Sequence, residues 1–304
     1  MEEFWQENSI VALGMFDGMH VGHQALLEKA VQVARLCDAV PAVYSFRNHP
    51  GSILKGAPKL LCTAEEKQAL MEESGIRRIA LVPFTRTVAD MPPEDFVAML
   101  QERCHATGLV CGYNYTFGAG ALGTPEMLET LCASRGMTVS VLDPVLVDGS
   151  PVSSTRVRQL VEEGDFPAVS RMLGRTYALL GTVVKNRGNG RKMGFPTANI
   201  PYDEVKEHAL PPEGVYATET LVDGVLWPSV TNIGSNPTVG GETVTVETHV
   251  SGFEGNLYGK AIRVGFLGRL RGDRKFESLD ALARQIASDA AQAEGIYARC
   301  HGKG

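Results

Sequence analysis

The chain has 304 residues and a net charge of −6, from 29 lysines and arginines against 35 aspartates and glutamates. Hydrophobic residues make up 44% and charged residues 21%, a composition typical of a globular protein with about two domains. The acidic balance excludes the basic footprint of a general nucleic-acid binder, and no apolar run is long enough to predict a membrane-spanning helix. Six scattered cysteines without a C-x-x-C pair, and an N-terminus without the pattern of a signal peptide, indicate a cytoplasmic protein.

A glycine-rich turn follows the apolar run Ile10–Leu13 and leads into a helical pattern. It reads Gly14-Met15-Phe16-Asp17-Gly18-Met19-His20-Val21-Gly22-His23. Strand, turn and helix in this order offer backbone N–H groups and the positive end of a helix dipole to an anion. The spacing matches neither the dinucleotide fingerprint nor the Walker loop. His20 and His23 are suited to donate hydrogen bonds to phosphate oxygens; the alternative, a zinc site, lacks a third protein ligand at a recognisable spacing.

Strand and helix patterns then alternate through the first half. Helices are predicted to begin at the capping box of Thr63 and Glu66, at Pro92 and at Thr124. The apolar runs between them predict strands at Val40–Phe46, Ile79–Val82, Leu109–Cys111 and Val139–Leu142. Such alternation favours a doubly wound parallel sheet, in which ligands bind beyond the carboxyl ends of the strands.

The segment Gly112–Gly118 follows one of these strands and offers two interpretations. If it is extended, Tyr115 and Phe117 share one face, where their rings could stack on a flat ligand, and Asn114 lies on the other face. The alternative is that the aromatic side chains pack in the core.

A second segment, Val152–Arg158, combines hydroxyl side chains with arginines. Ser154 suits the start of a helix whose apolar face turns Arg158 elsewhere. A helix N-terminus with a nearby arginine is a phosphate site by the same physics as the first turn, and a solvated surface arginine is the alternative.

The pattern changes at Gly174, where we place a boundary between domains 1–173 and 174–304. Beyond it, closely spaced strands separated by turn residues predict an antiparallel barrel, with a long closing helix from Ser278. The predicted strands are Tyr177–Val184, Gly214–Leu221, Trp227–Ile233, Thr243–Val250 and Ala261–Phe266.

Two strings of this half carry candidate chemistry. The first reads Gly188-Asn189-Gly190-Arg191-Lys192-Met193-Gly194-Phe195-Pro196-Thr197-Ala198-Asn199, a positive glycine-rich loop suited to phosphates. Thr197 and Asn199 point the same way in an extended segment, so they could ligate Mg²⁺ that arrives with ATP; a surface hairpin is the alternative.

The second string is Val244–Val250, where alternation places Glu247 and His249 on one face. A mid-strand carboxylate could serve as general base for a substrate hydroxyl, or it could face solvent. We expect His249 to have no functional role.

The first half resembles the FMN adenylyltransferase domain of bacterial bifunctional riboflavin kinase/FAD synthetases. The strings G-x-F-D-G-x-H-x-G-H, G-x-N-x-x-F-G and S-S-T-x-x-R occur in the family order, although the family's Pro-His-Pro loop reads Asn48-His49-Pro50 here. The resemblance implies that His20 and His23 bind ATP phosphates on the turn that holds Gly14, Phe16, Asp17 and Gly22. It also implies that Asn114 and Arg158 hold nucleotide or phosphate, with Ser154 near the same end. Asp17 is either a metal or ribose contact or a structural cap of the turn.

The second half resembles bacterial riboflavin kinases. The strings are G-x-G-R-x-x-G-F-P-T-A-N, P-x-x-G-V-Y-A, N-I-G-x-x-P-T, V-E-x-H, L-Y-G and L-R-x-x-x-K-F. The resemblance implies that Thr197 and Asn199 hold Mg²⁺–ATP, that Glu247 is the base on the ribityl 5′-hydroxyl, and that Arg271 lies near the flavin.

Together these resemblances predict a bifunctional enzyme with riboflavin, FMN and ATP as substrates. Riboflavin and ATP would give FMN, whose phosphate would then attack the α-phosphorus of a second ATP to give FAD and pyrophosphate. We expect a monomer or a weak homo-oligomer. The alternatives are a riboflavin kinase with an inactive first domain and a flavin-sensing regulator, which the net charge of −6 disfavours as a nucleic-acid binder.

Overall fold

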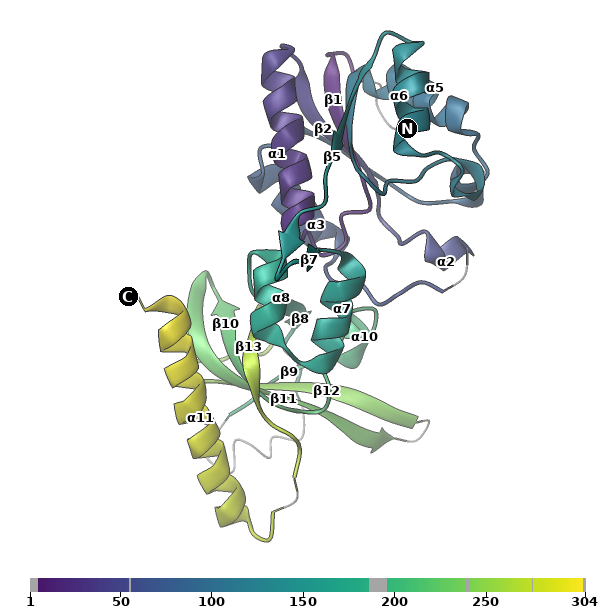
Figure 1. The fold of residues 1–304 in the computed structure, drawn as a ribbon. Coiled ribbons are helices and arrows are strands. Elements are labelled where there is room, and N and C mark those ends of the chain that lie inside the picture. Colours follow the sequence, from purple (N-terminus) through teal and green to yellow (C-terminus); the bar gives the residue numbers. More distant parts are fainter. Residues whose placement is uncertain (1–4, 55, 186–195, 239–240, 275, 303–304) are drawn as a thin grey trace. The chain divides into compact units, whose positions relative to one another are not determined.

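The computed structural model describes residues 5–54, 56–185, 196–238, 241–274 and 276–302, apart from the side chains of 236–243 and 279. It divides the chain into two compact units, Met1–Ser154 and Thr155–Gly304, each of which is described by itself below (Figure 1). The predicted boundary at Gly174 lies after two helices that follow this division, and it stays a prediction. No helix within the described ranges has the length and apolar content needed to cross a membrane.

The first unit is built on five parallel strands in the order β3-β2-β1-β4-β5. The strands are β1 (Ser9–Leu13), β2 (Val40–Phe46), β3 (Arg78–Val82), β4 (Ala106–Gly112) and β5 (Thr138–Leu142). The helices are α1 (Val21–Leu36), α2 (Gly51–Leu54), α3 (Ala64–Glu73), α4 (Arg86–Ala89), α5 (Pro93–Cys104), the 3₁₀ turn η1 (Ala119–Ala121) and α6 (Pro125–Ala133). A short hairpin, β6 (Leu146–Val147) and β7 (Ser150–Pro151), follows. The predicted doubly wound parallel sheet is therefore confirmed.

Two apolar cores cover the two faces of this sheet, because successive strand residues point to opposite sides. On β1, Val11 and Leu13 pack in the core under α5 and α6, whereas Ile10 and Ala12 pack in the core under α1 and α3 (Figure 1). The chain visits β2 and β3 on one side of β1 before it crosses to β4, so β1 and β4 are neighbours at the switch in strand order. Ligands of open α/β sheets bind at such a switch.

The second unit is a curved sheet of six strands in the order β8-β13-β10-β11-β12-β9, with antiparallel pairing throughout. The strands are β8 (Tyr177–Thr182), β9 (Ala198–Ile200), β10 (Gly214–Val222), β11 (Val225–Thr238), β12 (Gly241–Val250) and β13 (Ala261–Arg271). A bridge between Val184 and Asn199 joins the two edges of the sheet, which confirms the predicted barrel-like architecture.

Three helices pack on this second sheet: α8 (Phe166–Leu173), α10 (Tyr202–Val205) and α11 (Leu279–His301). The helix α7 (Ser154–Glu163) precedes them in the chain. Ser278 caps α11 as predicted, its hydroxyl accepting a hydrogen bond from the N–H of Ala281. The closing helix lies on the sheet face that carries Val215 and Val230, through Ala293 and its neighbours (Figure 1).

Candidate functional sites

The turn after β1 fixes the two predicted histidines against each other. His20 is the N-cap of α1, and its Nδ1 accepts a hydrogen bond from the backbone N–H of His23 at 3.3 Å. The two imidazole rings stack, with centroids 3.6 Å apart and planes 13° apart. Because Nδ1 of His20 is an acceptor, neutral His20 carries its proton on Nε2, which is then a hydrogen-bond donor.

Glycines give this turn its shape. Gly18 has φ +77°, and a Cβ there would lie 2.8 Å from the side chain of Leu61. A Cβ at Gly22 would lie 3.0 Å from Val152 and 3.2 Å from Nδ1 of His20, so the glycine leaves room for the imidazole. Gly14 is similarly close to the ring of Phe16, which is fully buried in the core. The side chain of Phe16 therefore packs in the core beneath the turn, so any contact of Phe16 with a ligand would come from its backbone.

Asp17 is buried inside the turn. Its Oδ1 accepts a hydrogen bond from the N–H of Leu61 at 2.9 Å, and its carbonyl accepts one from the hydroxyl of Ser154 at 2.9 Å. These contacts favour the structural alternative for Asp17, a cap of the turn, over a ligand contact. They also hold Ser154, at the start of α7, against the turn, and its implied role near the phosphates stays a prediction.

A buried lysine that the sequence did not single out braces the same turn. Lys67, on α3, donates hydrogen bonds to the carbonyls of Phe46 at 2.6 Å and Met15 at 3.2 Å. It thereby connects the turn after β1 to the end of β2. Burial lowers the pKa of Lys67, with Cys62 and Asp17 opposing that shift. The capping box of Thr63 was the only visible signal for this helix, and nothing in the pattern marked its lysine.

The segment after β4 emerges beside this turn, because β4 is the neighbour of β1. Asn114 is exposed there, whereas Phe117 is 6% exposed and belongs to the core, so core packing describes Phe117 better than ring stacking on a ligand. Tyr115 is half-buried and stacks on Phe117 with ring centroids 5.9 Å apart. Arg158 lies one turn into α7 and is largely buried. The ligand roles of Asn114, Tyr115 and Arg158 stay predictions.

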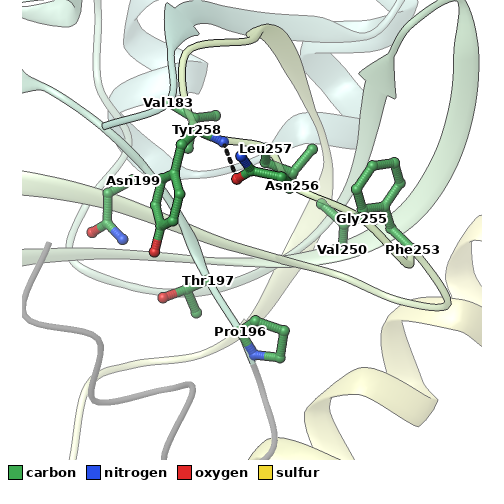
Figure 2. A pocket seen from close by; sticks show the side chains of 10 residues that line it. All are labelled: Val183, Pro196, Thr197, Asn199, Val250, Phe253, Gly255, Asn256, Leu257 and Tyr258. Carbon is green, nitrogen blue, oxygen red and sulfur yellow. Dashed lines mark hydrogen bonds between the residues drawn. The ribbon is translucent and has the colours of Figure 1, made fainter. Parts of the chain in front are cut away.

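The second unit contains a cavity of about 230 Å³ at the start of β9. Its walls are Val183, Pro196, Thr197, Asn199, Val250, Phe253, Gly255, Asn256, Leu257 and Tyr258. Figure 2 shows the polar ends of Thr197, Asn199 and Tyr258 directed toward the same space. Thr197 and Asn199, which the sequence predicted to point the same way, both line this cavity, and their role as metal ligands stays a prediction. Tyr258 was visible only as part of the L-Y-G string, and the ammonium of Lys185 lies 5.8 Å from its ring centroid.

Sheet register places the proposed base beside this cavity. Glu247 on β12 is the direct partner of Asn199 on β9 and of Asn232 on β11. Directly paired residues of antiparallel strands lie on the same face, with Cβ atoms about 5 Å apart. Burial raises the pKa of Glu247 above its usual value, which makes the carboxylate a better proton acceptor.

The same face continues across the sheet to Arg271. Asn232 pairs with Val215 on β10, and Val215 pairs with Arg271 on β13. Arg271 forms an ion pair at 2.8 Å with the buried carboxylate of Asp289 on α11. The guanidinium therefore anchors the closing helix, and its predicted place near the flavin stays a prediction.

His249 is a residue to which we gave no role from the sequence. Its Nδ1 lies 3.0 Å from the carbonyl oxygen of Pro196, directly before Thr197. The alternation that placed His249 on the face of Glu247 was a usable signal, but its partner Pro196 lies just before β9, a strand whose register the sequence does not show. The predicted phosphate residues Gly188, Gly190, Arg191 and Gly194 lie outside the described residues.

Comparisons with known proteins cover both halves. A family model described as FAD synthetase matches residues 3–156, and one described as riboflavin kinase matches residues 173–297. The bifunctional riboflavin kinase/FMN adenylyltransferase of Bacillus subtilis is 31% identical over 295 residues, 95% of this chain and 92% of the relative. The protein of the same name from Escherichia coli K12 is 32% identical over 96% of this chain and 94% of the relative. A crystal structure described as a macrolide-efflux protein from Streptococcus pneumoniae has a TM-score of 0.89 and 26% identity over 97% of both chains.

Proposed function

We propose that this chain, which belongs to the bifunctional riboflavin kinase/FMN adenylyltransferase family, carries out the family's two reactions at the two sites described above. Its first half is the FAD synthetase half, and its second half is the riboflavin kinase half. The register that pairs Glu247 with Asn199 beside the cavity is the observation that carries the assignment of the kinase site.

In the kinase half, Glu247 accepts the proton of the ribityl 5′-hydroxyl as its oxygen attacks the γ-phosphorus of ATP. The bond between the γ-phosphorus and the bridging oxygen breaks, and ADP leaves. The cavity that Thr197 and Asn199 line holds the phosphates of ATP. The raised pKa of Glu247 supports this role, because an efficient base has a pKa closer to the working pH than an ordinary glutamate.

The donor set at the cavity fits Mg²⁺. The Thr197 hydroxyl and the Asn199 amide carbonyl are oxygen donors, which this ion prefers, and such uncharged ligands suit a metal that arrives with a nucleotide. Bound Mg²⁺ supplies neutralisation of the charge on the phosphates. Thr197 and Asn199 would hold the ion, and the fold directs the hydroxyl oxygen of Thr197 and the amide group of Asn199 into the same space.

In the adenylyltransferase half, a phosphate oxygen of FMN attacks the α-phosphorus of ATP, and pyrophosphate leaves. The attacking oxygen is already anionic, so no base is required. Nε2–H of His20 and the imidazole of His23 donate to the phosphate oxygens, where charge develops on the leaving group. The N-terminus of α1 adds backbone N–H groups and the positive end of its dipole.

Both reactions are further proposed to take place in the cytoplasm. None of the six cysteines, all of which lie among the described residues, forms a disulfide, and four of them are buried, which supports a compartment that keeps thiols reduced.

The test separates the two sites by substitution. Glu247→Gln is expected to lower FMN formation from riboflavin by about 10²- to 10⁴-fold, because a general base contributes that much, while FAD formation from supplied FMN continues. His23→Ala is expected to remove pyrophosphate release and spare FMN formation. Chromatography of the flavins after incubation with Mg²⁺ and ATP reports both products. If either substitution abolishes both products, the assignment to separate sites is wrong; if wild-type protein forms only FMN, the first half is inactive.

A further inference from the structure

His249 is held at the kinase site by a specific backbone contact. It follows Glu247 by two residues on β12, so the two side chains share a face of the sheet. Its Nδ1 lies 3.0 Å from the carbonyl oxygen of Pro196. Because a carbonyl oxygen only accepts hydrogen bonds, Nδ1 of His249 carries the hydrogen in this pair.

The contact between His249 and Pro196 lies just before the residues where β9 pairs with β12. Pairing between β12 and β9 is limited to Ala198, Asn199 and Ile200, so it begins one residue after Thr197. Pro196 has no backbone N–H to donate. The hydrogen bond from His249 therefore fixes the peptide group that joins Pro196 to Thr197, immediately ahead of the ladder. The orientation of that peptide group sets the direction in which the hydroxyl of Thr197 points, and Figure 2 shows that hydroxyl directed into the cavity.

We propose that His249 is a positioning residue of the kinase site, which holds the Thr197 hydroxyl in the place where it ligates the Mg²⁺ of the bound nucleotide. This rests on the kinase site proposed above. Partners that orient metal ligands from behind affect metal affinity or activity by about 10- to 100-fold when they are removed. His249 acts through Thr197 and does not touch the reacting atoms.

The test measures binding of ADP by calorimetry, with and without Mg²⁺, in three variants of the full chain. His249→Leu removes the donor and is expected to weaken binding of Mg²⁺–ADP by about 10-fold, leaving binding of metal-free ADP unchanged. His249→Asn keeps an N–H near the position of Nδ1 and is expected to restore most of the affinity. Thr197→Val removes the ligand oxygen itself and is expected to show the same selective loss.

Kinetics of the same variants supply a second readout. His249→Leu is expected to raise the Mg²⁺ concentration needed for half-maximal FMN formation, while FAD formation from supplied FMN, which takes place in the other half, reports that the chain is folded. If His249→Leu binds Mg²⁺–ADP as tightly as the wild type while Thr197→Val does not, the inference is overturned and the kinase site stands. An equal loss with and without Mg²⁺ overturns it too. If Thr197→Val binds normally, the assignment of the metal ligand itself is wrong.

Discussion

Replacing Gly22 by alanine tests how closely the adenylyltransferase half depends on the position of His20. A Cβ at Gly22 would lie 3.2 Å from Nδ1 and 3.3 Å from Cε1 of His20, and 3.0 Å from Cγ1 of Val152. These separations are too short for ordinary contact, so the imidazole or Val152 must move by a few tenths of an ångström. A misplacement of 1 Å at a reacting group costs about 100-fold in rate, so such a shift corresponds to a loss of about fivefold.

The same substitution is not expected to destabilise the chain. Gly22 is the second residue of α1 and needs no positive φ, and alanine is a better helix former than glycine by as much as about 1 kcal/mol. Gly22→Ala should therefore reduce FAD formation from supplied FMN about fivefold while the midpoint of thermal unfolding stays level or rises. A slower formation of FAD without a lower unfolding midpoint would show that the substitution changes the geometry of the site and not the stability of the fold.

Gly295→Ala is the matched control, because Gly295 also lies in a helix and a Cβ there would make only an ordinary contact, 3.7 Å from Arg299. It is expected to stabilise α11 and to leave FMN and FAD formation unchanged. Product formation by chromatography and thermal unfolding are measured for both variants. If Gly22→Ala forms FAD at the wild-type rate, the fit between Gly22 and the His20 ring has no catalytic consequence. A loss of FMN formation as well would mean that the substitution disturbs more than this turn.

Four further predictions concern buried side chains. Because burial raises the pKa of Glu247, the acid limb of the pH profile of riboflavin phosphorylation should lie above the ordinary glutamate value of about 4.3, and a limb at that value would contradict a desolvated base. The folded state also holds the proton of Glu247 more tightly than the unfolded chain does, so the free energy of unfolding falls as the pH rises from the ordinary glutamate pKa through the raised pKa of the folded state. Glu247→Gln, which cannot ionise, should therefore unfold at a higher temperature than the wild type at pH 7. Lys67→Met should lower FAD formation about tenfold and spare FMN formation, since it frees two segments at the adenylyltransferase site; equal rates would show that the brace is dispensable. Iodoacetamide at pH 8 should modify the exposed Cys37 and Cys300 but not Cys111, whose pKa burial raises to about 12, and mass spectrometry of the native protein reads this directly.

The sequence was sufficient for the first site wherever local rules decide the structure. The turn after β1, its glycines and the histidines at the start of α1 follow from chain-local patterns, and the parallel sheet follows from alternation of strands and helices. The features of the first site that the sequence does not predict depend on contacts between segments that are distant along the chain. The capping role of Asp17 requires the N–H of Leu61, and the brace by Lys67 requires carbonyls on two other segments. Such partners are 21 to 52 residues away for the lysine, so no periodic pattern signals them.

The kinase site shows how sheet register converts separate motifs into one surface. Asn199, Glu247 and Arg271 belong to three different sequence motifs. Alternation along a strand predicts only which residues of the same strand share a face with each of them. The pairing of β9, β12, β11, β10 and β13 places Asn199, Glu247, Asn232, Val215 and Arg271 in a single row. Neighbouring strands are about 4.8 Å apart, so the backbone of Glu247 is one strand spacing from Asn199 and three strand spacings along the sheet from Arg271. A phosphate donor at one end of the row and a flavin ring extending toward the other would therefore both be within reach of Glu247, through the ribityl chain. Asn232 is the partner of Glu247 on the side toward Arg271, so it is the first residue that a ribityl chain running from Glu247 toward Arg271 would meet.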